Sequence, residues 1–179
     1  MKGMVFTNFL EMVEERFGFV MADSLVTESS LPSGGAYTSV GQYDYKEMFT
    51  LIGKLHQKTG ISVADLCKEF GKYLFTKLVE AYPHFVSRVD NVFDFLGSID
   101  NYIHIEVRKL YPDAELPHFE TRQITPHQLE MIYSSSRGLH YLAEGLIEGS
   151  LTHFNTTATI TSEPLTDGRV RFLITRNHS

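Results

Sequence analysis

The sequence has little sulfur and no segment suited to crossing a membrane. Cys67 is its only cysteine, so an internal disulfide is impossible, and we expect a protein of the reducing cytoplasm. No apolar run approaches the ~20 residues that a membrane-spanning helix requires. The N-terminal segment carries charges too early and too often for a secretory signal. We therefore expect a domain that does not insert into membranes.

Basic charge is also scarce, whereas aromatic residues are plentiful. The chain has 16 Lys and Arg against 22 Asp and Glu, which gives a formal net charge of −6. The basic residues are scattered and form no stripe of the kind that neutralises phosphates, so nucleic acid is not an expected partner. With 13 Phe and 9 Tyr in 179 residues, the chain has enough apolar material for one domain that encloses a ligand.

Common catalytic and metal-binding motifs are missing. The eight histidines form no His-x-x-x-His pair and no Cys-rich cluster, so a zinc site is not expected. Neither a Gly-x-x-x-x-Gly-Lys loop nor a Gly-x-Ser-x-Gly elbow is present, which leaves phosphoryl transfer and serine hydrolysis without support. Cys67 falls on an apolar helix face, where an inert thiol is expected. We do not expect an enzyme.

The first half of the chain has helical periodicity. Ser62 can cap a helix together with Asp65, and Pro112 ends the last one. The Pro- and Gly-containing segment from Leu31 to about Gln42 is expected to be a loop. Apolar residues at helical spacing predict helices over about 5–17, 21–26, 45–55, 62–79 and 99–110.

The second half has a different pattern. Leu129, Met131 and Tyr133 recur at every second position, as on one face of a strand. Residues 138–154 again favour a helix, and two short strands flank a hairpin turn at 164–168. We predict an α+β fold in one domain, 1–179: a helical subdomain (about 1–60), then a subdomain (about 61–179) with an antiparallel sheet of about four strands and a long crossing helix.

The motif Tyr133-x-Ser135-x-Arg137 follows this strand pattern. Side chains at i, i+2 and i+4 of a strand project from one face at steps of ~6.6 Å, which would align two hydroxyls and a guanidinium. Such a row suits carboxylates, because Arg engages them through charge-assisted, bidentate hydrogen bonds. The alternative is a solvated strand end, which is the commoner role of short Ser-rich stretches.

His104 lies beside Ile103 and Val107, at the edge of the apolar stripe of its predicted helix. A neutral imidazole there could bind a metal through one nitrogen while an acceptor fixes the other. A hydrogen-bonded core histidine is the alternative. The residues alone leave both open, because no further ligand lies at a metal-binding spacing.

Taken together, these motifs resemble those of the haem nitric oxide/oxygen binding (H-NOX) domains of bacteria and of soluble guanylate cyclase. The resemblance covers essentially the whole chain and is carried by Met1-Lys2-Gly3, residues 104–117, the 133–137 motif and residues 144–149. It implies the H-NOX fold, with haem b in the second subdomain and His104 as the iron ligand. It also implies that Pro117 presses on the porphyrin, and that the propionates are held by Tyr133, Ser135 and Arg137.

The same resemblance places apolar residues on the gas-binding side of the haem. Leu142, Phe9 and Leu74 align with the tyrosine, tryptophan and asparagine of oxygen-binding relatives, and Val5 and Leu146 are expected to complete the wall. Bound dioxygen gains from a hydrogen-bond donor, whereas nitric oxide and carbon monoxide depend on one much less. The pocket is therefore expected to exclude dioxygen. The neighbouring Tyr141 or His140 could supply a donor if the alignment shifts by one residue or a side chain turns into the pocket.

By this resemblance the protein is a sensor. Nitric oxide bound to ferrous iron would weaken or break the His104 bond and bias a two-state switch. The output is expected to pass to a separate protein, either a sensor histidine kinase or a cyclic-di-GMP synthase/phosphodiesterase. The alternatives are an oxygen-binding haem sensor, a haem enzyme, and a partner-binding domain that has lost haem.

Overall fold

The computed structural model describes residues 1–177, and His178 and Ser179 lie outside the described part. The helices and strands form the predicted α+β fold. None of the helices within residues 1–177 is long and apolar enough to cross a membrane. The elements are α1 (Gly3–Phe17), α2 (Phe19–Glu28), α3 (Tyr45–Thr59), α4 (Val63–Ala81), α5 (His84–Ser87), α6 (Val92–Gly97), the π-helical turn η1 (Ile99–Ile103), α7 (His104–Leu110), β1 (His118–Thr125), β2 (Gln128–Ser134), α8 (His140–His153), β3 (Ala158–Pro164) and β4 (Val170–Arg176).

The sheet is antiparallel throughout, with strand order β1-β2-β4-β3. In β2, Leu129, Met131 and Tyr133 are buried while the residues between them are partly exposed, as the alternation predicts. The predicted hairpin is also present, with Pro164 opposite Val170 at its closed end. Tyr133 pairs with Phe119 of β1, which brings both aromatic side chains to the same end of the sheet.

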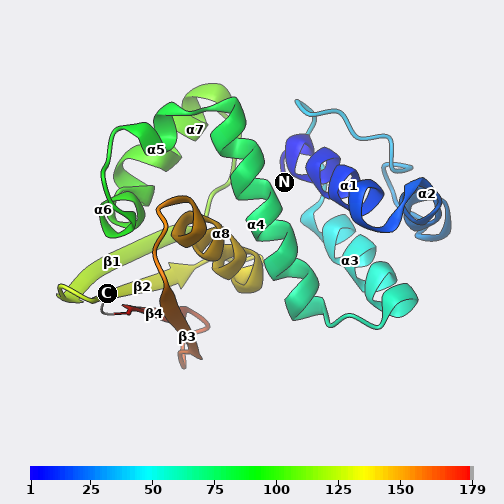
Figure 1. Cartoon of the computed structure of the whole chain (residues 1–179). Coiled ribbons are helices and arrows are strands. Elements are labelled where there is room, and N and C mark those ends of the chain that lie inside the picture. The colour runs from blue at the N-terminus through cyan, green and yellow to red at the C-terminus, as the bar shows by residue number, and fades with distance from the viewer. Residues whose placement is uncertain (178–179) are drawn as a thin grey trace.

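Helix α4 runs through the middle of the molecule and packs along α8 (Figure 1). Its predicted cap is present, because the Ser62 hydroxyl accepts a hydrogen bond from the Asp65 N–H at 3.1 Å. The two helices approach most closely at Gly71 and Gly145. A Cβ atom on Gly145 would lie 2.8 Å from the Lys68 Cα and 2.9 Å from the Gly71 Cα, so glycine is required where the backbones touch.

Two hydrophobic cores lie on opposite sides of α4 (Figure 1). The first joins α1, α2 and α3 to one face of α4, and it includes Leu66, Phe70 and Leu74. The second lies between the sheet, α8 and the short helices α5 and α6, and α4 reaches it through Phe75. The first core therefore extends beyond residue 60 onto α4.

The predicted continuous helix over 99–110 is wrong in detail. Residues Ile99–Ile103 form a π-helical turn, and the α-helical part begins at His104 and ends at Leu110. The Ser98 carbonyl accepts hydrogen bonds from the N–H groups of both Tyr102 (3.0 Å) and Ile103 (3.1 Å), so the turn holds an extra residue. Hydrophobic spacing does not reveal one inserted residue, whereas Pro112 correctly predicted where the helix stops.

Candidate functional site

A cavity of about 340 Å³ lies between the two cores. Helices α1 and α4–α8, strands β1 and β2, and the 111–117 segment all contribute to its walls. The walls contain nine of the ten residues predicted to form the site, namely Val5, Leu74, His104, Pro117, Tyr133, Ser135, Arg137, Leu142 and Leu146.

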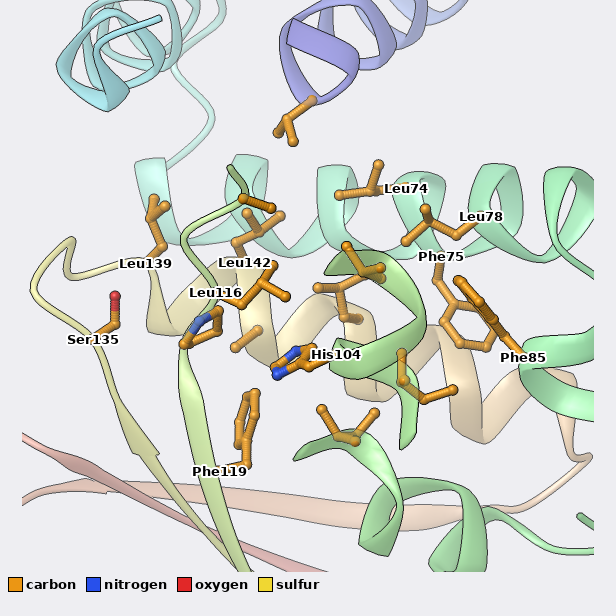
Figure 2. A pocket seen from close by; sticks show the side chains of 18 of the residues that line it. Leu74, Phe75, Leu78, Phe85, His104, Leu116, Phe119, Ser135, Leu139 and Leu142 are labelled. Carbon is orange, nitrogen blue, oxygen red and sulfur yellow. The ribbon is translucent and has the colours of Figure 1, made fainter. Parts of the chain in front are cut away.

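His104 reaches into this cavity from the first turn of α7 (Figure 2). Its Nδ1 atom lies 3.2 Å from Oδ1 of Asp100, but the two atoms are not oriented for a hydrogen bond. Burial lowers the pKa of His104, and this effect exceeds the opposing effect of the Asp100 carboxylate. The ring is therefore neutral at neutral pH, and Nε2 is the nitrogen available to a metal.

Asp100 is a site residue that the sequence analysis missed. Besides facing His104, its carboxylate accepts a hydrogen bond from the Phe119 N–H (3.1 Å) and contacts Nδ1 of His118. These contacts connect the ligand helix to β1. The spacing of Asp100 and His104, four residues apart on a predicted helix, is the signal that could have identified this pair.

The predicted geometry of the carboxylate-binding motif is wrong, although its three residues do meet at the cavity. Strand β2 ends at Ser134, so Ser135 and Arg137 project from a turn rather than from one strand face. The turn forms because the Arg137 N–H donates to the Ser135 hydroxyl (3.1 Å), which competes with continuation of the strand. The mostly buried Arg137 guanidinium donates to Glu115 at 2.7 Å.

Tyr133 forms the inner end of this motif. Burial raises its pKa, and this effect exceeds the opposing hydrogen bonds involving Ser135 and the Leu139 backbone. Its hydroxyl is therefore protonated at neutral pH and can donate to a carboxylate. Its ring lies 5.5 Å from that of Phe119, which in turn lies 6.3 Å from the His104 ring. Tyr133 and His104 are thus held by one aromatic cluster.

The wall of the cavity that faces His104 is formed by hydrocarbon side chains. Leu74 comes from α4 and Leu142 from α8, and Figure 2 shows both on the helices that face His104. The expectation for Phe9 is not met, because Phe9 is absent from the cavity lining within residues 1–177. Its fully buried ring instead fills the first core, 5.2 Å from the Phe70 ring in an edge-on contact.

Tyr141 and His140 lie outside the described cavity lining. Tyr141 is 36% exposed, and the Lys68 ammonium lies 5.7 Å from the centre of its ring. The His140 ring packs on Tyr141 with centroids 4.2 Å apart. Neither side chain is placed to donate a hydrogen bond into the cavity.

The residues present fit a haem. Within residues 1–177 no group of three or more His, Cys, Asp or Glu could hold a metal ion, so a metal bound by His104 needs its other ligands from a cofactor. The walls are largely apolar, and Tyr133, Ser135 and Arg137 supply carboxylate-binding groups. Apolar walls, one neutral imidazole and these donors together match a flat metal macrocycle with acidic side arms.

Solved structures of similar proteins show the class to which this fold belongs. The fold is that of H-NOX proteins. A crystal structure of the K. algicida H-NOX mutant A71G in the Fe(II) unliganded state is 41% identical, with 100% of this chain and 98% of that chain covered and a TM-score of 0.94. The S. oneidensis protein in the Fe(II)NO state is 28% identical, with coverage of 99% and 100% and a TM-score of 0.92. The IWP-051-bound Shewanella woodyi protein in the Fe(II)CO state is 39% identical, with coverage of 99% and 95% and a TM-score of 0.84.

The family assignment agrees with the fold. The family model described as Haem-NO-binding matches residues 2–162. The chain therefore belongs to the haem-NO-binding family, whose members are haem-binding gas sensors. A comparison with curated proteins gave no match.

Proposed function

We propose that this protein is a cytoplasmic haem b sensor of nitric oxide, and of carbon monoxide, that excludes dioxygen and regulates a separate signalling protein. The observation that carries the proposal is the neutral, buried His104 imidazole in an apolar cavity that also contains Tyr133, Ser135 and Arg137. Haem would supply an iron atom with a coordination position for the gas.

The residues of this chain have separate parts in the proposed function. His104 would hold the ferrous iron through Nε2, while Tyr133, Ser135 and Arg137 would hold the propionates. Pro117 lines the same cavity and would press on the porphyrin. A gas that weakens the bond to His104 would free α7 from the cofactor, while the contacts of Asp100 still join this region to β1.

Selectivity for nitric oxide over dioxygen is proposed on the basis of the hydrocarbon wall. Val5, Leu74 and Leu142 line the cavity without offering a hydrogen-bond donor. Bound dioxygen is polarised, so the absence of a hydrogen-bond donor lowers its affinity more than it lowers the affinity of nitric oxide or carbon monoxide. Two of the solved relatives are in the Fe(II)NO and Fe(II)CO states, which is consistent with the same two ligands here.

The output would pass to a separate signalling protein, which we propose is a sensor histidine kinase or a cyclic-di-GMP synthase/phosphodiesterase. A ligand biases such a partner only if the protein has two states with different affinities for the gas. The bond that His104 would make to the iron would provide that difference. A haem enzyme would additionally require an acid and a base on the gas-binding side of the iron. The residues expected on that side, Leu74 and Leu142, are hydrocarbon.

Visible spectra test the proposal directly. The reduced protein should show a histidine-ligated ferrous spectrum that is unchanged in air, shifts with carbon monoxide, and becomes five-coordinate with nitric oxide. His104→Ala is the matched variant: it should lose stable haem binding and recover it when imidazole is added. A stable spectrum of a dioxygen complex would contradict the proposed selectivity, and full haem content in His104→Ala without imidazole would contradict the ligand assignment.

A further inference from the structure

Lys2 lines the same cavity as Arg137, and the proposed function assigns it no part. Its side chain is only 11% exposed, although it carries a charged ammonium group. Nζ donates to the Val40 carbonyl at 3.1 Å and to Asp113 at 2.9 Å, and it lies 5.6 Å from the centre of the Tyr111 ring. An ammonium has three N–H donors, so these two acceptors leave one donor for a further partner.

The backbone around Lys2 holds it in this position. Lys2 forms an isolated bridge with Gln42, and the Gly3 N–H donates to the Gly41 carbonyl at 2.8 Å. A Cβ atom on residue 3 would lie 2.8 Å from the carbonyl carbon of Thr38 and closer still to its oxygen. Glycine is therefore needed at position 3 for the 38–42 segment to pack here, and this packing places Lys2 at the cavity.

Lys2 and Arg137 both line the cavity, and each pairs with an acid of the same short segment. Lys2 pairs with Asp113, and Arg137 pairs with Glu115 at 2.7 Å. Asp113 and Glu115 are two residues apart, so their Cα atoms are separated by at most about 7 Å. Two cations therefore lie beside one short segment of the cavity wall.

We infer that Lys2 is a second cation for the acidic arms of the cofactor, pairing with one haem propionate while Arg137 pairs with the other. The two propionates of haem b leave the same edge of the porphyrin, which suits two cations that line one cavity and pair with the same short segment. Asp113 is 59% exposed, and its pKa is held below its ordinary value by the Lys2 hydrogen bond, so Lys2 already binds a carboxylate in this region. This inference rests on the proposed binding of haem.

The test compares haem b with its dimethyl ester, in which both propionates are uncharged. Each form is loaded into the full chain, and its loss to an excess of a haem-scavenging apoprotein is timed. Lys2→Gln should lose haem b about tenfold faster than the parent protein, because a charge-assisted hydrogen bond is removed. It should lose the dimethyl ester at the parent rate. Lys2→Arg should restore the parent rate with haem b.

Matched variants separate this role from a structural one. Lys54→Gln removes the same charge from α3, outside the described cavity lining, and should change neither rate. Arg137→Gln should release haem b faster, which establishes the site independently of Lys2. If Lys2→Gln loses both forms equally fast, or loses haem b at the parent rate, the inference is overturned. If the parent protein acquires no Soret band with haem b, the proposed function fails first, and this inference fails with it.

Discussion

Asp100 determines how the His104 imidazole is presented to the cavity. Its carboxylate lies beside Nδ1, and it is itself fixed by the Phe119 N–H and by His118. A carboxylate beside one ring nitrogen increases the basicity of the other, so Asp100 would influence a bound iron through His104. In this role Asp100 is a positioning residue rather than a ligand.

Asp100→Asn should weaken the bond between iron and His104, because it removes the negative charge that lies 3.2 Å from Nδ1 and increases the basicity of the imidazole. We expect the iron–histidine stretching vibration of the reduced protein, measured by resonance Raman, to move to lower frequency, and haem to dissociate about tenfold faster. Asp90→Asn removes an equal charge at an exposed position and should leave both quantities unchanged. An unshifted vibration in Asp100→Asn would show that this carboxylate only anchors β1.

Leu142→Tyr tests the hydrocarbon wall. The new phenol would enter the cavity from α8 and could donate a hydrogen bond to bound dioxygen. We expect the visible spectrum of the reduced variant to change in air, unlike that of the parent. Leu142→Phe adds the same ring without the hydroxyl and should remain insensitive to air. An identical response of the two variants would mean that size, rather than hydrogen bonding, governs dioxygen binding.

Among the helices and strands, the sequence predicted the ones whose residues are buried at regular intervals. The cap and apolar face of α4 and the alternation of β2 were predicted because each faces a core on one side. The limits of β1 were not predicted, because only Phe119 and Thr121 are partly buried and the last four residues of the strand are all exposed. The turn after Ser134 was missed because it depends on one hydrogen bond between a backbone N–H and Ser135.

The contact between α4 and α8 also contains a buried acid. Glu144 on α8 is 6% exposed, and Lys68 of α4 lies 3.6 Å from its Oε1, while Oε2 has no hydrogen-bond partner among the described residues. Burial raises the pKa of Glu144, and this effect exceeds the opposing effect of Lys68. Because the folded state binds this proton more tightly than the unfolded state, the associated stability is present at low pH and is lost as the pH rises through the folded pKa.

Glu144→Gln should therefore stabilise the protein at neutral pH. The amide stays uncharged, so the variant avoids the cost of burying a carboxylate above its pKa. We expect a higher melting temperature than the parent at pH 7.5 and a smaller difference near pH 4.5, measured by circular dichroism. Glu80→Gln, which removes an equal charge from an exposed position on α4, should show no such trend. A gain that is larger at pH 4.5 would contradict the assignment.

At the scale of the whole molecule, the cavity is where the two cores meet. Val5 and Leu74 reach it from the first core, and Met131 and Ile147 reach it from the second. A ligand in this position contacts both cores at once. Binding should therefore stabilise the complete fold rather than one half of it.

Haem should raise the melting temperature in a single transition. With free haem at about a thousandfold excess over its dissociation constant, the gain in free energy of unfolding is about 4 kcal/mol. For a chain of this length that corresponds to roughly 8–16 °C, which differential scanning calorimetry would detect. His104→Ala should show a much smaller rise. Two separate transitions, with only one sensitive to haem, would contradict a shared ligand.

The π-helical turn before His104 has a consequence for the lengths of related chains. Because η1 is an α-helical turn with one residue added, a chain that lacks this residue could keep α7 and continue as a regular helix. Elsewhere in a helix, the same deletion rotates everything that follows by about 100°. In a shorter relative, the counterpart of Asp100 would stand three rather than four positions before the histidine, and its carboxylate would approach Nδ1 from a different direction. A gap at this point in an alignment would therefore mark a difference in how the iron ligand is supported.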